Sequence, residues 1–281
     1  MMHTSSRHEP NVGTDVSPPC SDIEKAQGRD TSVPTDASAL LQQTATLDPY
    51  MSIVGLKKSY GLKPILRGID LSIGRGERVA ILGSNGTGKT TLLRILAGLT
   101  RPSAGTVTIE GFDSVRDAQA VRQCVGFVAH QPYLYEELTA LENLLFFGRM
   151  YNVKQAQERA GMLLQRVGLE KRMRERVSTF SRGQVQRLSW VRALLHAPHL
   201  LLLDEPDTGL DQDGQALIDA LLQEHTERAG TTLFTTHQLE RALSLGTQFV
   251  LLNKGRIVYQ HETSSLALEE LQRVYQQGVL A

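Results

Sequence analysis

A glycine-rich stretch from Gly83 to Thr90 places the strongest constraint on how this chain can fold. It reads GSNGTGKT, follows the apolar run 79–82, and precedes residues 91–97, whose apolar positions have helical spacing. A strand, a glycine turn and a helix in that order are the context that a phosphate-binding loop requires. Glycines allow successive backbone N–H groups to point at one anion, and the helix start adds unpaired donors. The stretch therefore predicts binding of a nucleotide.

Each position of this loop is a candidate ligand of the phosphates. Lys89 can reach the β- and γ-phosphates, and the Thr90 hydroxyl can coordinate Mg²⁺. An ordinary glycine turn is the alternative, but the complete pattern G-x-x-x-x-G-K-[ST] is rare by chance. The predicted phosphate-loop residues are Gly83, Ser84, Asn85, Gly86, Thr87, Gly88, Lys89, Thr90 and Thr91.

Composition limits the classes of protein to which the chain can belong. Apolar residues make up 41% of it, enough for a core, and 30 basic residues balance 30 acidic ones, so the net charge favours neither nucleic acid nor anionic lipid. Cys20 and Cys124 lack the spacing of a zinc site, and we expect no disulfide. No run approaches the roughly 18 apolar residues of a spanning helix, and no secretory signal precedes the first strand. We expect a soluble intracellular protein.

The order of patterns predicts a tail followed by an α/β domain. Residues 1–49 are rich in Ser, Thr, Pro, Asp and Gly, which favours a disordered tail. Residues 52–58 and 65–73 alternate as half-buried strands do. Further strands are expected at 106–109, 125–128, 200–204, 232–236, 249–252 and 256–259.

Helical patterns separate these strands. Thr139 and Glu142 have capping-box spacing, and residues 155–167 are amphipathic and end at Gly168. Ser181 is placed to cap a helix that runs to Leu195, and helices are expected at 212–229 and from about residue 265. Strands alternating with helices indicate a mostly parallel sheet with its ligands at the strand carboxyl ends.

Two carboxylates follow the apolar run 200–203. Asp204 can hold Mg²⁺ through its water shell, and Glu205 can orient or deprotonate the water that attacks the γ-phosphate. A solvated strand end before Pro206 is the alternative reading of these residues. The phosphate loop upstream favours the catalytic one.

Several motifs together resemble the ABC-type ATPases over about residues 51–260. Residues 180–184, FSRGQ, look like the signature motif of that family. Gln131, the run 209–211 and His237 fall where the family has its glutamine, D and switch-histidine motifs, and Tyr60 matches the aromatic residue that stacks on adenine. The resemblance implies a P-loop NTPase (RecA-like) α/β core with an antiparallel β subdomain and an inserted α-helical subdomain at about 133–190. The ATP-binding domain would span residues 50–281.

The resemblance also implies how these residues act. ATP and Mg²⁺ would be bound, with Gln131 as a ligand of Mg²⁺ or water, and His237 at the γ-phosphate. Ser181, Gly183 and Gln184 begin a helix and form a second anion site, which makes sense if two chains sandwich ATP between them. Core packing is the alternative for Tyr60, and a structural role is the alternative for His237.

The partners that the resemblance implies are a second ATP-binding subunit and an integral membrane permease. The second subunit is expected to be another copy of this chain, although a relative fits the sequence as well. The protein would be cytoplasmic and peripheral on the inner face of the cell membrane. Aromatic residues in 132–147 suit a docking patch or the core of the helical subdomain. The arginines of 172–192 suit a solvated or phosphate-facing surface, and no nucleic-acid site is expected.

The branch of the family is indicated by finer matches. Arg182 stands where many members have glycine, and residues 208–211 read TGLD in place of SALD. With residues 129–147 and 192–196, these features resemble the ATP-binding subunit of the cytochrome c biogenesis haem exporter. Drug and polysaccharide exporters share these features in part, and export of a drug, a lipid or a polysaccharide is the alternative. A non-transport ABC ATPase is a more remote one.

Overall fold

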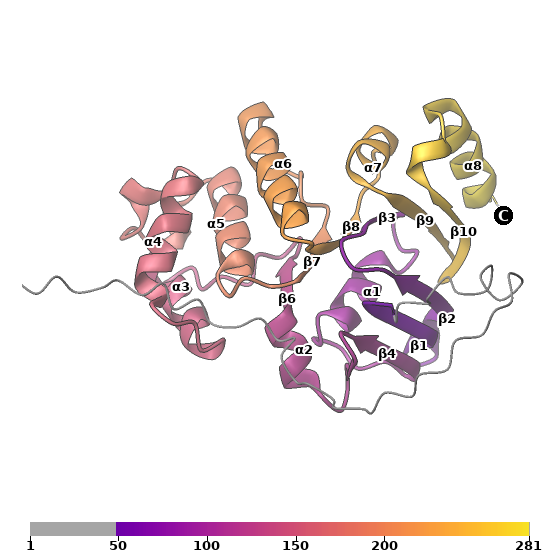
Figure 1. Cartoon of the computed structure of the whole chain (residues 1–281), viewed down its shortest axis with the longest axis horizontal. Helices are drawn as coiled ribbons and strands as arrows, with labels where there is room; N and C mark the ends of the chain where they lie inside the picture. The colour runs from indigo at the N-terminus through magenta and orange to yellow at the C-terminus, as the bar shows by residue number, and fades with distance from the viewer. Residues whose placement is uncertain (1–48, 281) are drawn as a thin grey trace, which may run out of the picture. The chain divides into compact units, whose positions relative to one another are not determined.

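The strand that precedes the glycine loop, β3, lies inside a six-stranded sheet (Figure 1). The computed structural model describes residues 49–280. The strand order is β10-β9-β3-β8-β7-β6, and all neighbours are parallel except β9 and β10. This confirms the predicted α/β class. The strands are β3 (Arg78–Leu82), β6 (Val125–Val128), β7 (Leu200–Asp204), β8 (Thr231–Thr235), β9 (Gln248–Asn253) and β10 (Arg256–Glu262).

A second sheet is antiparallel and has the order β2-β1-β4-β5. It confirms the antiparallel β part that the family resemblance implies. Its edge strand β5 has only two residues, too few for an alternating pattern, and was not predicted from the sequence. The strands are β1 (Met51–Tyr60), β2 (Lys63–Ile73), β4 (Ala104–Ile109) and β5 (Phe112–Asp113).

Helices cover both faces of the parallel sheet. Helix α1 contacts both β7 and β2, while α3, α4 and α5 contact one another, and α5 also contacts β6 (Figure 1). The α-helices are α1 (Lys89–Leu96), α2 (Ala118–Cys124), α3 (Ala140–Met150), α4 (Ala156–Arg166), α5 (Arg182–Leu194), α6 (Gln212–Glu227), α7 (Leu239–Leu245) and α8 (Leu268–Leu280). Short 3-10 turns are η1 (Glu170–Arg172), η2 (Val177–Thr179) and η3 (Thr263–Ser265).

The central strands are buried on both faces, which explains their continuous apolar runs. In β7, Leu200 and Leu202 belong to a core shared with the antiparallel sheet and α1. The alternate residues Leu201 and Leu203 face a second core, which contains residues of α5, α6 and the helices before them. The strands of the parallel sheet are therefore packed between two apolar layers.

Arg192 is one place where the structure differs from the sequence prediction. It was expected on a solvated or phosphate-facing surface, but it is buried, and its Nη2 donates to the Phe127 carbonyl oxygen at 2.5 Å. Its guanidinium lies 5.3 Å from the ring centroid of Phe147. Burial lowers the pKa of Arg192. The residue lies on the side of α5 that faces β6, so the aromatic ring and the strand carbonyl replace water around it.

Three further findings concern the ends of the chain and its helices. The predicted tail lies outside the described residues, except for Pro49. The last helix begins at Leu268 and not near residue 265, because the 3-10 turn η3 occupies that position. Within residues 49–280, none of the helices combines the length and apolar character needed to cross a membrane.

Candidate functional site

Three neighbouring strands end at the same edge of the parallel sheet and carry the predicted site. The glycine loop follows β3, Asp204 ends β7, and His237 lies two residues beyond β8. Since β8 lies between β3 and β7 and all three are parallel, these segments converge. Burial lowers the pKa of the Lys89 ammonium group. The negative charges of Glu205 and then Asp204 lie close enough to act in the opposite direction and raise it. One edge of the sheet thus brings together a buried cation and two carboxylates.

The loop curls tightly around the Lys89 amine. Lys89 Nζ donates to the carbonyl oxygens of Gly83 at 2.7 Å and Ser84 at 3.1 Å. A Cβ atom at Gly83 would lie 2.4 Å from the carbonyl oxygen of Leu252, and φ is +153° there. A Cβ atom at Gly88, where φ is +111°, would lie 2.7 Å from a side-chain carbon of Leu66. Only glycine fits either position without displacing neighbouring atoms.

The remaining loop positions divide between buried and accessible groups. Thr87 is buried, and its hydroxyl donates to the Ser84 carbonyl oxygen at 2.9 Å. Asn85, Gly86 and Thr90 are exposed. Thr90 is the second residue of α1, so its hydroxyl is open to a ligand at the helix start. The loop therefore presents accessible donors over a buried lysine.

A threonine hydroxyl links the two carboxylate residues at the end of β7. Thr235 Oγ1 donates to Asp204 Oδ1 at 2.8 Å and accepts from the Glu205 backbone N–H at 3.0 Å. Thr235 was not among the residues predicted from the sequence. A hydroxyl-bearing residue at the end of a buried strand was the available signal, but the run TTLFTT holds several threonines and does not distinguish this one.

The second oxygen of Asp204 is suited to a cation. Asp204 is only 3% exposed, and its Oδ2 is buried without a hydrogen-bond partner. Mg²⁺ prefers hard oxygen ligands and needs few from the protein when phosphates and water supply the rest. Within residues 49–280, no cluster of three or more His, Cys, Asp or Glu residues could hold a metal by itself. Asp204 with the accessible Thr90 hydroxyl fits an Mg²⁺ ion that arrives with a nucleotide.

Glu205 and His237 face each other across the strand ends. Glu205 Oε1 lies 3.7 Å from His237 Nδ1. Glu205 adopts φ +52°, a left-handed conformation that is uncommon for a residue other than glycine. The imidazole of His237 is exposed and the Glu205 carboxylate is partly exposed, so both can reach a ligand. A carboxylate and an imidazole at this distance can both contact one water molecule, and the imidazole can also donate to a phosphate oxygen.

The predicted second anion site begins helix α5. Ser181 is exposed, its hydroxyl accepts from the Gln184 backbone N–H at 3.3 Å, and the Gln184 Oε1 atom accepts from the Ser181 N–H at 2.9 Å. Gln184 Oε1 also accepts from Arg172 at 2.6 Å, so this predicted nucleotide ligand is engaged within the helix start. A Cβ atom on Gly183 would lie 3.6 Å from the Gly209 carbonyl oxygen. Within residues 49–280, no hydrogen bond or ion pair joins this helix start to the phosphate loop.

Tyr60 and Gln131 are both accessible. Tyr60 ends β1, is 52% exposed, and has the Lys58 ammonium group 4.8 Å from its ring centroid. Its exposure contradicts core packing, the alternative reading of this residue. Gln131 is exposed in the loop that follows β6. Both side chains are therefore free to approach a ligand.

The aromatic residues of 132–147 divide between surface and core. Tyr135 is 51% exposed and Phe146 is 40% exposed, and their ring centroids are 5.1 Å apart in an edge-on arrangement. Tyr133 and Phe147 instead pack against the two buried cores. The core reading thus applies to Tyr133 and Phe147, while Tyr135 and Phe146 lie at the surface and their role in docking stays a prediction.

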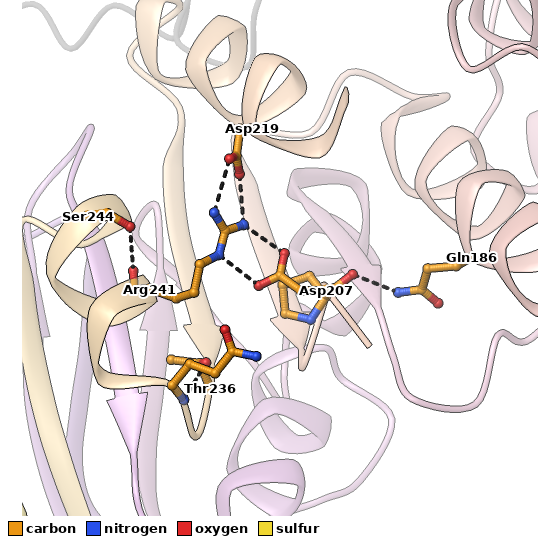
Figure 2. A network of polar contacts seen from close by, with 8 residues as sticks. Gln186, Asp207, Asp219, Thr236, Arg241 and Ser244 are labelled. Carbon is orange, nitrogen blue, oxygen red and sulfur yellow. Dashed lines mark hydrogen bonds and ion pairs between the residues drawn. The ribbon is translucent and has the colours of Figure 1, made fainter. Parts of the chain in front are cut away.

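The loop 206–211 after Glu205 is held by polar contacts that the sequence did not indicate. Figure 2 shows Arg241 of α7 between the carboxylates of Asp207 and Asp219. On the other side of the loop, Gln186 of α5 donates to the Pro206 carbonyl oxygen at 3.1 Å. Contacts between residues this far apart in sequence leave no local pattern.

Comparison with known proteins identifies relatives that share most of this chain. The family model for ABC transporters matches residues 66–208. The uncharacterized ABC transporter ATP-binding protein YdbJ of Bacillus subtilis (strain 168) is 40% identical over 75% of this chain and 68% of its own length. The daunorubicin resistance ATP-binding protein DrrA3 of Streptomyces coeruleorubidus is 38% identical over 79% and 71%. The Nod factor export ATP-binding protein I of Paraburkholderia xenovorans (strain LB400) is 39% identical over 77% and 72%.

Solved structures share the fold at lower identity. An ATP-binding subunit of an ABC transporter is 28% identical, with a TM-score of 0.75 over 81% of this chain and 99% of its own. A dimeric ATP-binding cassette in a post-hydrolysis state with ADP and phosphate is 28% identical, with a TM-score of 0.70 over 77% and 100%. The cbiO1 protein of Clostridium perfringens, part of the ABC transporter complex cbiONQ, is 26% identical, with a TM-score of 0.67 over 82% and 95%.

The predicted ATPase class is confirmed by these relatives together with the fold. The family model spans the glycine loop, the signature-like run and both carboxylates. The relatives share more than 30% of their residues over at least two thirds of both chains. The chain belongs to the ABC transporter family, as an ATP-binding subunit that hydrolyses ATP.

Proposed function

We propose that two copies of this chain close around two Mg-ATP and that hydrolysis drives a separate integral membrane permease. The observation that carries this proposal is the convergence of Lys89, Asp204, Glu205 and His237 at three neighbouring strand ends. The ATP-binding domain would comprise residues 50–281, with its helical subdomain at about 133–190.

ATP would bind over the glycine loop. Its β- and γ-phosphate oxygens would replace the carbonyl oxygens of Gly83 and Ser84 as acceptors for Lys89, while loop N–H groups surround the phosphates. Tyr60 is exposed at the end of β1 and would stack on adenine. The other residues of 83–91 would form the remainder of this surface.

Three residues would hold Mg²⁺. Thr90 and Gln131 offer accessible oxygens, and Asp204 offers the buried Oδ2 that has no other partner. When bound, Mg²⁺ supplies positive charge to the β- and γ-phosphate oxygens. Asp204 keeps its orientation through the hydroxyl of Thr235.

Glu205 and His237 would act at the γ-phosphate. Glu205 is placed to orient the attacking water and accept its proton, and His237 to donate to a γ-phosphate oxygen. Catalysis would consist of positioning and charge neutralisation, because phosphoryl transfer requires no covalent intermediate on the protein.

A second subunit would complete each site. Ser181, Gly183 and Gln184 begin α5, and within residues 49–280 no hydrogen bond or ion pair connects them to the glycine loop of the same chain. A self-complementary dimer would put them against the phosphates of the other copy. The dimeric neighbour with ADP and phosphate supports this arrangement.

The permease would dock on the helical subdomain. The exposed pair Tyr135 and Phe146 offers aromatic anchors close in sequence to Gln131, so ATP-driven movement there would reach the membrane partner. The relation to cbiO1, which belongs to a transporter complex, supports a membrane partner. The protein would then be cytoplasmic and peripheral on the inner face of the membrane.

The names of two relatives, one for daunorubicin resistance and one for Nod factor export, favour an export permease with a cargo other than haem. Haem export for cytochrome c biogenesis remains a prediction, and the names of these relatives do not mention haem. Contacts with the cargo would lie in the permease.

Affinity purification from gently solubilised native membranes tests the partner and the cargo together. We expect an export permease to co-purify, and ATP hydrolysis in reconstituted membranes to rise with one cargo. A cytochrome c maturation protein with a haem absorption band would support haem export instead. Purification on ribosomes or DNA without a membrane protein would contradict the proposed function.

A further inference from the structure

Arg241 connects the segment that carries Glu205 to the segment that carries His237. It lies in α7, four residues after His237, and Asp207 lies two residues after Glu205. Arg241 Nε donates to Asp207 Oδ2 at 3.0 Å, and Nη2 donates to Oδ1 at 2.8 Å. Two parallel hydrogen bonds of this kind fix orientation as well as distance. The ends of β7 and β8 are thus tied together beyond the sheet (Figure 2).

A second carboxylate holds the same guanidinium from α6. Arg241 Nη1 and Nη2 donate to the two oxygens of Asp219 at 3.0 and 2.7 Å. Hydrogen bonds to Asp219 and then to Asp207 raise the pKa of Arg241. The Arg241 side chain is only 17% exposed and that of Asp207 12%, so water screens their pairing weakly. Loss of one partner would leave a poorly solvated charge.

The loop 206–211 is held from its other side by α5, the helix that Ser181 caps. Gln186 of α5 donates to the Pro206 carbonyl oxygen at 3.1 Å, and Arg187 lies 3.7 Å from Asp211. The loop 206–211 is therefore held by polar contacts with α5 on one side and α7 on the other. A change at Arg241 would alter the position of the loop relative to both.

We propose that Arg241 is a positioning residue for ATP hydrolysis, and that its pairing with Asp207 sets the distance between Glu205 and His237. This inference rests on the proposed function, since it assumes that these two residues act at the γ-phosphate. Arg241 itself would not touch the nucleotide. Its replacement should therefore affect turnover more than binding of ATP.

The test compares full-length variants by kcat, KM for ATP, nucleotide-binding stoichiometry and melting temperature. Arg241→Met should lower kcat per nucleotide-binding subunit by about tenfold, with KM changed by less than about twofold. The kcat of Arg241→Lys should lie between those of the wild type and Arg241→Met, because lysine keeps the positive charge but cannot form the two parallel hydrogen bonds. Asp207→Asn nearly preserves the side chain's volume and should lower kcat similarly. Arg228→Met is the control, because it removes an arginine paired with Glu224 on the surface.

The double variant Arg241→Met with Asp207→Asn separates positioning from general destabilisation. If the two residues act as one pair, its kcat should be no lower than that of Arg241→Met alone. An unchanged kcat per binding-competent subunit, or losses that multiply, would overturn the inference.

Glu205→Gln in the same series distinguishes this inference from the proposed function. A wild-type rate in Glu205→Gln would contradict the assigned base. An inactive Glu205→Gln beside a fully active Arg241→Met would contradict only the role of Arg241.

Discussion

At Thr235 a single hydroxyl orients both residues of the carboxylate pair. It donates to Asp204 and accepts from the Glu205 N–H, so each of its polar roles is occupied. Thr235 is fully buried, and the groups it serves have little access to water. A buried polar group that loses its partner pays a desolvation cost larger than the net gain of an ordinary hydrogen bond. This residue should therefore matter for stability and for turnover.

Thr235→Val keeps the shape of the side chain and removes its hydroxyl. We expect the free energy of unfolding to fall by about 1–3 kcal/mol, because Asp204 Oδ1 and the Glu205 N–H both lose a partner. Turnover should fall more than affinity for ATP. Urea denaturation and steady-state ATPase kinetics measure the two effects. Thr235→Ser retains the hydroxyl as the matched control; equal losses in both variants would contradict this account.

Residues of the site differ in how far sequence could identify them. The glycine loop and the pair Asp204 and Glu205 form short local patterns next to strands. Their chemistry can therefore be inferred from the sequence alone. The bond from Arg241 to Asp207 crosses 34 positions. Arg192 was placed wrongly for the same reason, since its burial depends on Phe127 and Phe147. Contacts set by tertiary packing leave no local signature.

Among the elements, α3 and α5 begin with the same capping motif but lie in different surroundings. Each has a complete capping box, made by Thr139 with Glu142 in α3 and by Ser181 with Gln184 in α5. Hydrogen bonds from the Thr139 N–H and hydroxyl lower the pKa of Glu142, as expected for an ionised capping carboxylate. Only the α5 start belongs to the proposed interface between subunits. The two helices thus separate the effect of a cap from the effect of a ligand.

Thr139→Ala and Ser181→Ala should each lower the free energy of unfolding by about 1 kcal/mol, since each removes a side-chain acceptor from a helix start. Only Ser181→Ala should also lower ATP hydrolysis and ATP-dependent dimerisation. Denaturant unfolding, ATPase rate and sedimentation measure these effects. If Ser181→Ala matched Thr139→Ala in activity, the proposed role of Ser181 at the nucleotide would be contradicted.

The elements that sequence missed are short. The seven-residue helices α2 and α7 complete fewer than two turns, too few for a periodic pattern to stand out. The strand β7 was predicted because burial on both faces favours an uninterrupted apolar run, and all five residues of β8 are likewise buried. The length and burial of an element thus determined whether it could be predicted from the sequence.

For the whole molecule, acid sensitivity should come in part from His196, a half-buried histidine between β6 and the helical region. The His196 ring stacks on Tyr151 with centroids 4.0 Å apart, and its Nε2 lies 3.0 Å from the Val125 carbonyl oxygen. We assign the proton of the neutral ring to Nε2, which leaves Nδ1 buried without a partner. Burial lowers the pKa of His196 to about 4. The folded protein therefore holds this ring neutral.

Stability should fall as pH falls through the window between 6.5 and about 4. In that window the unfolded chain binds a proton at His196 that the folded protein does not, so acid favours unfolding, by up to about 3 kcal/mol from this group. The contribution is fully present above pH 6.5. Urea unfolding of the wild type and His196→Gln across the window isolates it. A stability difference that does not change with pH would contradict the assignment.

ATP-dependent dimerisation of Glu205→Gln tests the central claim most directly. This variant keeps the phosphate loop, Asp204 and the α5 helix start but removes the proposed base. Sedimentation of the purified chain with Mg²⁺ and ATP should give a stable dimer that retains two nucleotides without turnover. ADP should give a monomer. A variant that stays monomeric with saturating ATP, or that hydrolyses ATP at the wild-type rate, would contradict the account.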